Sequence, residues 1–566
     1  MFKKILFLIA VSATVYGQEF KQRDSNLEFF TTINDSLIAL KTPNNLSIPS
    51  KLPYPIIFIH GLNSSSETWN NTTAYLDSQY NFTYGGRFDF CLNYDGNNAT
   101  ANKNMYPASG ADIAAFESTT LQAGDYYYVN FNVGLNGAVA PSGTNNVMSN
   151  LSAIAKQGVA VKKVVERVLQ LTGRDKVILV GHSMGGLASR EYIQDATLWQ
   201  TDNKHHVAKL LTLGTPHGGS NASDSFLSFF SGIDTKSEAV RDLKTSYYYS
   251  GDVGRFLFGG IEVNNSNNMN DSMSSQDFYN VDVNCNGQNG DTVTGLNQKP
   301  IDNFIDFSSV IGRITGGTTD GIVDEPSSIM DTYYTSLQFP TKLFYFNSTF
   351  DFIENHTELP DKYYQIMQGL DEPNFKELAY GVNTNQNYIG FTTIQNPTAA
   401  DNDFYKFTVS NTMDATVSIS TIVTGTMTAA ILDASGAVIG TTQNNTGNTL
   451  SFTRTIPAGD YFLKITSTSP VNTNYQTPYN FIIGTTLSAT NFDINKITAY
   501  PNPVNETLHI DHVDFEKAVC YNDLGQKVFE VQNQNNTIDC SSLSNGLYVI
   551  ELQKGETKTY LKVIKE

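Results

Sequence analysis

The stretch KVILVGHSMGGLASREYIQ, residues 176–194, decides the fold of this chain. It opens with a continuous apolar run, which is typical of a parallel strand buried on both faces. A tight turn follows, and then a helix that we expect over about 186–194. Similar apolar runs lie in KLPYPIIFIH (51–60) and KLLTLGTPHGGS (209–220), and helical spacing of valines predicts a helix near 147–172. This alternation predicts an α/β fold with a mostly parallel sheet flanked by helices.

The turn in this stretch, residues 181–185, has the pattern Gly-x-Ser-x-Gly. On so tight a strand-to-helix turn a serine projects its Oγ above the sheet, and a side chain at either glycine would crowd the turn. We therefore interpret Ser183 as a nucleophile, against the alternative of a plain turn. The backbone N–H of Met184 would face an oxyanion from the helix N-terminus. The second oxyanion donor is expected after the first strand, where Leu62 N–H is the candidate and a simple strand-end turn at His60 is the alternative.

A nucleophilic serine needs a histidine base and an acid, here in the chain order serine, acid, histidine. His356 fits this order, because it follows the returning strand character of residues 342–353. The acid is expected on a loop before it, where Asp320 and Asp324 are available, and Gly321 favours Asp320 by permitting a sharp bend. The other histidines are excluded by chain order, by closeness to the nucleophile strand or by lying in the terminal domain: His60, His182, His205, His206, His217, His509 and His512.

The length of 566 residues predicts three or four domains at roughly 100–200 residues each. A basic start before a short apolar core predicts a signal peptide, and no later segment reaches the length of a membrane-spanning helix. An α/β catalytic domain with an aromatic, Asn- and Ser-rich insertion follows. Alternating apolar and polar segments then predict two all-β sandwich domains. The expected boundaries are 1–17 for the signal peptide, 18–383 for the α/β domain, about 219–310 for its insertion, 384–485 for the first sandwich, 486–492 for a linker and 493–566 for the second sandwich.

The formal net charge of −19 restricts the partners. An acidic surface repels phosphate backbones, so nucleic acid is not expected as a partner. It also repels anionic membrane faces, which disfavours a basic membrane-docking surface. The acidity is best interpreted as an aid to the solubility of an exported protein.

Four cysteines can be oxidised if the protein is exported: Cys91, Cys285, Cys520 and Cys540. The last two are close enough in sequence for a bridge inside one small domain, and free buried thiols are the alternative. Sequence does not determine the connectivity.

Five motifs resemble the bacterial lipase branch of the α/β-hydrolase family over about residues 53–360. The resemblance implies that Asp320 is the triad acid and His356 the base, and that the insertion is cap-like and covers the acyl site rather than forming a mere inserted subdomain. It implies a secreted serine hydrolase that cleaves triacylglycerol or related lipid esters through an acyl-enzyme. A phospholipase, thioesterase or peptidase on the same fold, and a non-catalytic surface adhesin, are the alternatives. The motifs are PIIFIHGL, GHSMGGLASREY, LLTLGTPHGGS, TDGIVDEPSS and NHTELP.

Two further resemblances concern the β-rich domains. Residues 384–485, with DNDFYKFTV, PAGDYFLKITS and YQTPYNFII, resemble the pre-peptidase C-terminal domain. Residues 493–566, with AYPNPVNETLHI, VCYNDLGQKV, SSLSNGLYVIEL and YLKVIKE, are similar to the C-terminal sorting domain of type IX secretion. These resemblances imply a Gram-negative source, passage through the periplasm, handling by the type IX machinery and a final place outside the cell or on its surface.

Ester hydrolysis of this kind requires no cofactor, but calcium is a structural candidate at two places. The lipase resemblance implies a site near the histidine base, where Glu358 fits as a ligand but Lys362 replaces an uncharged one. Separately, Asp282, Asn284 and Asn286 resemble the start of a calcium loop, with oxygen ligands at alternate positions and a glycine for the turn. The expected acid at its twelfth position is a valine, and a polar loop without metal is the alternative.

Overall fold

The computed structural model describes most of the chain. The predicted signal peptide, the calcium-loop residues Asp282, Asn284 and Asn286, and Cys285 and His512 lie outside the described residues. The described residues are 30–33, 36–39, 51–92, 115–117, 121–133, 148–220, 238–243, 296–334, 337–348, 354–393, 400–423, 425–468, 478–487, 497–511, 515–533, 535–555 and 557–566.

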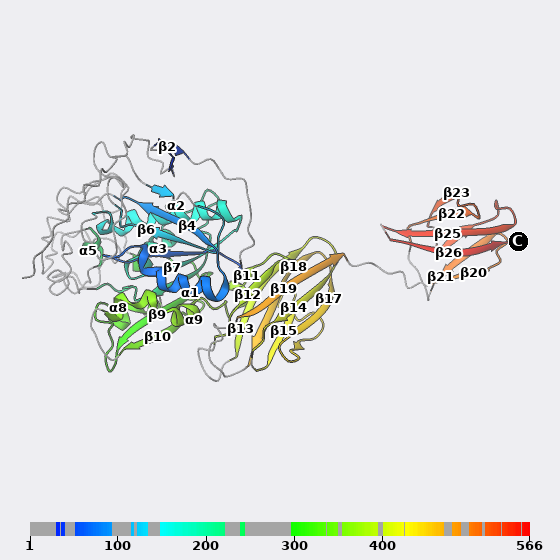
Figure 1. Cartoon of the computed structure of the whole chain (residues 1–566). Helices are drawn as coiled ribbons and strands as arrows, with labels where there is room; N and C mark the ends of the chain where they lie inside the picture. Colours follow the sequence, from blue (N-terminus) through cyan, green and yellow to red (C-terminus); the bar gives the residue numbers. More distant parts are fainter. Residues whose placement is uncertain are drawn as a thin grey trace, which may run out of the picture. The chain divides into compact units, whose positions relative to one another are not determined.

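A ten-stranded sheet forms the centre of the α/β domain (Figure 1). Seven strands run parallel in the order β10-β9-β8-β7-β3-β6-β4, which confirms the predicted mostly parallel sheet. Beyond β4 the sheet continues through the antiparallel β5 to the antiparallel pair β1 and β2. The strands are β1 (Phe30–Ile33), β2 (Ser36–Ala39), β3 (Ile56–Ile59), β4 (Tyr84–Phe90), β5 (Ala115–Glu117), β6 (Tyr126–Asn130), β7 (Val177–His182), β8 (Val207–Leu213), β9 (Asp306–Ile314) and β10 (Lys342–Ser348).

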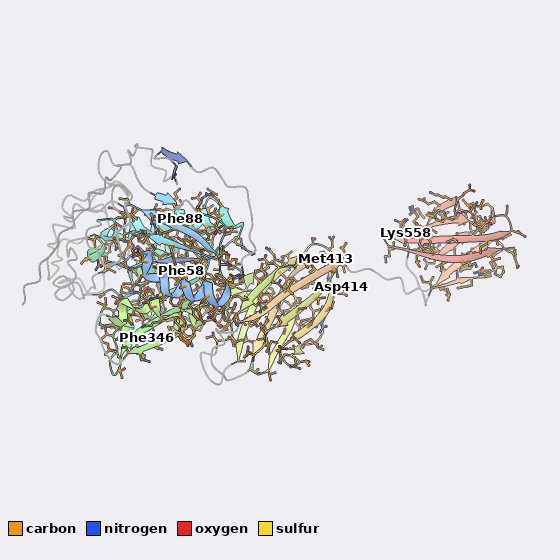
Figure 2. All side chains as sticks on the ribbon, in the orientation of Figure 1. Phe58, Phe88, Phe346, Met413, Asp414 and Lys558 are labelled. Atoms are coloured by element: carbon orange, nitrogen blue, oxygen red, sulfur yellow. The ribbon has the colours of Figure 1, made fainter. Side chains whose placement is uncertain are left out.

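Helices cover both faces of the sheet, because successive side chains of a strand point to opposite faces. In β3, Ile57 packs into a core that includes Val164 of α2, whereas Phe58 packs against Trp69 next to α1. Helix α2 packs on α3, and α1 packs on α9. Phe58 and Phe88 are both fully buried inside these layers (Figure 2). The helices are α1 (Asn70–Tyr80), α2 (Ile154–Thr172), α3 (Met184–Gln194), α5 (Glu238–Leu243), α7 (Glu325–Ser328), α8 (Glu354–Thr357) and α9 (Tyr363–Gly369).

Helix α2 is shorter than the helix predicted near 147–172. A 3-10 turn (Met148–Leu151) comes first, and the α-helix begins only at Ile154. The Ile154 N–H donates to the Asp242 carboxylate of α5 at 2.9 Å, so a residue of the insertion caps the helix. A local sequence pattern could not locate this start, because the capping residue is 88 positions away.

Two β-sheets follow the α/β domain and form the predicted all-β region (Figure 1). One has the order β11-β13-β18-β15-β16 and the other β12-β19-β14-β17. Alternate residues of β18 are buried, as expected for strands with one face on a core. The strands are β11 (Tyr380–Gly381), β12 (Asn387–Gly390), β13 (Asp401–Val409), β14 (Met413–Ser420), β15 (Met427–Leu432), β16 (Gln443–Asn444), β17 (Leu450–Ile456), β18 (Gly459–Ser467) and β19 (Tyr479–Leu487).

The C-terminal region forms two more sheets with a core of its own. Their orders are β20-β21-β24 and β23-β22-β25-β26. Cys520 and Cys540 are buried in this core as free thiols, which is the alternative to the bridge. None of the helices in the described part of the chain is long and apolar enough to cross a membrane. The strands are β20 (Thr498–Tyr500), β21 (Thr507–Asp511), β22 (Lys517–Asn522), β23 (Lys527–Gln532), β24 (Thr537–Asp539), β25 (Gly546–Lys554) and β26 (Thr557–Lys565).

Candidate active site

Ser183 occupies the turn between β7 and α3, in a conformation that few non-glycine residues adopt. Its φ is 51° and its ψ is −124°. Such a backbone costs about 1–3 kcal/mol and persists only where the surroundings enforce it. A Cβ at Gly181 would lie 2.5 Å from the Gly186 Cα, and a Cβ at Gly185 would lie 2.4 Å from the Ile59 carbonyl oxygen. The two glycines of the motif are therefore required by the close approach of backbone on both sides of the serine.

His356 lies on α8, after β10, and its ring joins Ser183 to Asp320. Its Nε2 is 2.9 Å from Ser183 Oγ, and its Nδ1 is 2.6 Å from Asp320 Oδ2. The three residues are 8%, 4% and 1% exposed in the order Ser183, His356, Asp320. The hydroxyl can donate to Nε2 while Nδ1–H donates to the carboxylate, so the three groups form one hydrogen-bonded chain shielded from water.

Asp320 is fixed by its own loop after β9. Its Oδ1 accepts the backbone N–H groups of Ile322 at 2.9 Å and Val323 at 2.7 Å, which leaves Oδ2 for the histidine. Gly321 has the positive φ, 94°, that the sharp bend needs. Asp324 instead precedes α7 and its side chain is exposed. The structure thus brings Asp320, and not Asp324, to His356.

His182 contacts the backbone of His356, a role that the sequence did not suggest. Its Nε2 lies 2.9 Å from the backbone carbonyl oxygen of His356. Burial, reinforced by the nearby His356, holds the pKa of His182 well below its usual value, so the ring is neutral and its Nε2–H donates. The only sequence signal was its place beside Ser183 in the Gly-x-Ser-x-Gly pattern.

The loop after β3 runs directly beside Ser183. A Cβ at Gly61 would lie 2.7 Å from the Ser183 Cβ. His60 Nε2 accepts the Phe131 N–H at 2.8 Å, so its Nδ1–H donates to the Gly61 carbonyl oxygen, also at 2.8 Å. Burial lowers the pKa of His60 to about 4 and keeps this neutral form at physiological pH. Since C=O and N–H point in opposite directions across a trans peptide, the Leu62 N–H is turned away from the His60 ring.

An apolar cluster adjoins the two residues proposed to supply oxyanion donors. Met184 packs with Ile154 and Leu187, and Leu62 packs against the same cluster. Ala239 and Leu243 of α5 belong to it as well, so the described helix of the insertion contacts this side of the site. The cap-like role of the whole insertion stays a prediction, because residues 221–237 and 244–295 are outside the described part.

The calcium position implied near His356 does not fit a cation. Lys362 Nζ donates to Glu358 Oε2 at 2.7 Å. An ammonium group therefore already pairs with the carboxylate that calcium would use, and a second positive charge there would be repelled.

Two families match separate parts of the chain. Residues 53–295 match the PGAP1-like alpha/beta domain, and residues 498–566 match the secretion system C-terminal sorting domain. Triacylglycerol lipases from Pseudarthrobacter phenanthrenivorans and Burkholderia plantarii are each 34% identical over 106 residues, or 18% of this chain. The matched part covers 30% and 26% of those lipases, so the chain spans less than a third of their length.

Solved structures resemble the chain more distantly. A Bacillus licheniformis lipase in its propeptide form is 15% identical, with a TM-score of 0.27 over 92% of this chain and 95% of that one. The pre-peptidase C-terminal domain of a Bacillus anthracis collagenase is 16% identical, with a TM-score of 0.17 over 20% of this chain and 98% of that one. Because these TM-scores are low, the assignment of the fold rests on the strand order and the family matches and not on the solved structures. By these observations the chain has an α/β domain that is similar to the PGAP1-like alpha/beta domain and a C-terminal region that is similar to the secretion system C-terminal sorting domain.

Proposed function

We propose that this protein is a secreted serine hydrolase that cleaves carboxylic esters, with lipid esters as its substrates. One observation carries the proposal: a hydrogen-bonded chain runs from Ser183 Oγ through His356 to Asp320, with separations of 2.9 and 2.6 Å. A relay of this kind turns a hydroxyl, which is a weak nucleophile by itself, into one that attacks carbonyl carbon at neutral pH.

The relay acts in two half-reactions. As Ser183 Oγ attacks the ester carbonyl carbon, His356 Nε2 takes its proton, and then returns that proton to the departing alkoxide. Water attacks the resulting acyl-enzyme, gives a proton to His356 and releases the acid, while the proton passes back to Ser183 Oγ. Asp320 accepts the hydrogen bond from Nδ1–H throughout, so Nε2 stays free to accept the proton. The negative charge of Asp320 also stabilises the imidazolium.

The oxyanion formed in each half-reaction needs donors placed in advance. The Met184 N–H stands at the first turn of α3, where orphan N–H groups and the helix dipole favour negative charge. The Leu62 N–H is the second candidate, since Gly61 lies against Ser183 and the Gly61 carbonyl is tied to His60. Two such donors typically supply about 3–4 kcal/mol each of transition-state stabilisation.

Lipid esters are favoured over polar esters by the surroundings of the serine. The side chains of Leu62 and Met184 pack in one apolar cluster, and the curated relatives over part of the chain are triacylglycerol lipases. A phospholipase, thioesterase or peptidase would use the same relay. A non-catalytic adhesin is disfavoured, because adhesion does not require a serine with a strained backbone that is hydrogen-bonded to a buried histidine.

Export is the second part of the proposal. The sorting-domain match at 498–566 supports a secreted or cell-surface protein. We infer the type IX route of a Gram-negative bacterium, with periplasmic passage after removal of the predicted signal peptide.

The proposal is tested with the purified chain and p-nitrophenyl esters of increasing acyl length, beside phospholipid and peptide substrates. Wild type is expected to hydrolyse the esters, and Ser183→Ala to lose about 10⁶-fold in turnover. Ser78→Ala, at an exposed position on α1, is the matched control and should behave as wild type. Near-wild-type hydrolysis by Ser183→Ala would sink the proposal, and preference for phospholipid or peptide would redirect its substrate class.

A further inference from the structure

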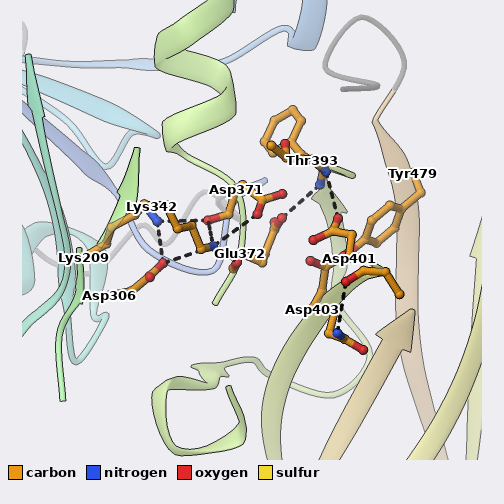
Figure 3. A network of polar contacts seen from close by, with 12 residues as sticks. Lys209, Asp306, Lys342, Asp371, Glu372, Thr393, Asp401, Asp403 and Tyr479 are labelled. Carbon is orange, nitrogen blue, oxygen red and sulfur yellow. Dashed lines mark hydrogen bonds and ion pairs between the residues drawn. The ribbon is translucent and has the colours of Figure 1, made fainter. Parts of the chain in front are cut away.

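A cluster of buried carboxylates lies between the α/β domain and the sandwich (Figure 3). Asp371 and Glu372 follow α9 at the end of the α/β domain. Asp401 and Asp403 lie at the start of β13 in the sandwich. The relay around Ser183 does not use any of these groups.

Negative charge exceeds positive charge in this cluster. Lys342 Nζ lies 3.1 Å from Asp371 Oδ2 and 3.7 Å from Asp306 Oδ2, and Lys209 also pairs with Asp306. Both lysines belong to the α/β domain. Within the described ranges the cluster therefore has two ammonium groups for five buried carboxylates: Asp306, Asp371, Glu372, Asp401 and Asp403.

The sandwich carboxylates have only neutral hydrogen-bond donors among the described residues. Asp401 Oδ2 accepts the Thr393 N–H at 2.8 Å, and Asp403 Oδ2 accepts the Tyr479 hydroxyl at 2.6 Å. Burial together with neighbouring carboxylates raises the pKa of Asp401 and of Asp403 well above the ordinary range. A carboxylate buried without a positively charged partner is costly, so a cation at this place would stabilise the cluster.

Unpartnered oxygen atoms point to a ligand. Asp371, Asp401 and Asp403 are 0%, 3% and 1% exposed, and the Oδ1 atom of each has no hydrogen-bond partner among the described residues. Thr393 is an independent sign from a neutral side chain: its hydroxyl is also buried and has no hydrogen-bond partner in the part of the chain that the structure describes. The backbone N–H of Thr393 donates to Asp401 Oδ2, so this residue lies beside the cluster.

The spacing matches calcium. One ligand oxygen from each of Asp371, Asp401 and Asp403 lies within 4.8 Å of the others. Calcium binds oxygen at about 2.3–2.6 Å, so two of its ligands are at most about 5 Å apart. Magnesium binds at about 2.0–2.1 Å and keeps several waters, which a buried site with three carboxylates does not favour.

We propose that Asp371, Asp401 and Asp403 bind a calcium ion that fastens the catalytic α/β domain to the sandwich, with the Thr393 hydroxyl as a neutral ligand. The ion offsets the unpaired negative charge and satisfies the free oxygens. Because ligands from both domains are needed, calcium stabilises the folded contact between them by mass action. Its ligands are different residues from those of both calcium positions suggested by the sequence.

Calorimetric titration of the chelator-treated full chain with Ca²⁺ alone tests this site. Wild type should bind calcium and unfold at a higher temperature in its presence. Asp401→Asn and Asp403→Asn should each lose one equivalent and the temperature shift that comes with it. Asp460→Asn, which removes an exposed carboxylate from the same sandwich, should keep both. Absence of binding by wild type, or unchanged stoichiometry in both cluster variants, would overturn the proposal.

The alternative is that the buried carboxylates share protons and bind no calcium, and it leads to the opposite results. Asparagine has the shape of a protonated aspartic acid, so the cluster variants would then be as stable as wild type and calcium would shift neither. If a variant does not fold, the wild-type protein still tests the site with Tb³⁺, which shares calcium's preference for oxygen ligands. Bound Tb³⁺ should luminesce when Tyr479 is excited, and added Ca²⁺ should displace it and remove the luminescence. No displaceable luminescence would overturn the site. Ser183→Ala should bind calcium normally, which separates this site from the esterase proposal.

Discussion

At the residue scale, the arrangement of the site depends on which oxygen of Asp320 is free. Two backbone N–H groups hold Oδ1, so Oδ2 is aimed at His356 Nδ1. The fixed carboxylate selects the tautomer that leaves Nε2 unprotonated beside Ser183 Oγ. His182 fixes the backbone of the same histidine through the His356 carbonyl oxygen. Position and tautomer of the base are therefore set by separate contacts.

Asp320→Asn is expected to lower kcat by about 10⁴-fold, because the amide oxygen keeps the backbone bonds while its NH₂ group faces Nδ1 and selects the wrong tautomer. The measurement is hydrolysis of a p-nitrophenyl ester under saturating conditions. Asp324→Asn is the matched control and should remain close to wild type, since the Asp324 side chain is exposed. The assignment of the acid is wrong if Asp324→Asn is the variant that loses activity.

At the scale of elements, the site is assembled from the carboxyl ends of four parallel strands. Leu62 follows β3, Ser183 follows β7, Asp320 follows β9 and His356 follows β10. Parallel strands bring their carboxyl ends to one edge of the sheet, which is where α/β folds place ligands. Residues that are far apart in sequence can meet there without a long connecting element.

Much of this could be predicted from sequence, because β3 and the first four residues of β7 are continuous apolar runs and β8 is mostly apolar. Strand β9 has no such signal. It contains the buried polar residues Asp306 and Ser309, whose partners Lys209 and Thr212 lie on the neighbouring strand β8. The predicted start of α2 was wrong for a related reason, because the residue that caps this helix, Asp242, lies on α5.

Gly61→Ala tests the approach of the β3 loop to the nucleophile. The new Cβ would lie 2.7 Å from the Ser183 Cβ and 3.1 Å from the His182 carbonyl oxygen, so one backbone must shift by about 1 Å. Displacement of this size can cost about 10²-fold in rate. We expect kcat to fall by that factor, with the unfolding temperature nearly unchanged. Gly484→Ala, whose nearest neighbour atoms are 3.7 Å away, should leave the ester-hydrolysis rate unaltered. Equal rates for both variants would refute the close approach.

At the scale of the whole molecule, the chain combines an α/β domain with all-β regions that follow it. The all-β character of the last part follows from alternating sequence patterns, but the carboxylate cluster does not. Asp401 and Asp403 are two residues apart on β13 and therefore share a face, which is the buried face that also carries Tyr405 and Phe407. A local sequence pattern does not show that Asp371, from the α/β domain, lies beside them.

Deletion of residues 498–566 tests the export proposal. The C-terminal sheets have their own hydrophobic core, so we expect the truncated chain to retain ester hydrolysis. In a Gram-negative host with a type IX system it should accumulate in the periplasm, whereas the full chain reaches the medium or cell surface. Fractionation followed by activity assay measures this. Truncated protein outside the cell at the level of the full chain would contradict the sorting role.

The most direct measurement of the central claim is covalent labelling of the wild-type protein with a fluorophosphonate, followed by peptide mapping. The account predicts a single phosphonyl group on Ser183 Oγ, formed at a rate that falls sharply in Asp320→Asn. An unlabelled protein, or a label on any other residue, would contradict it.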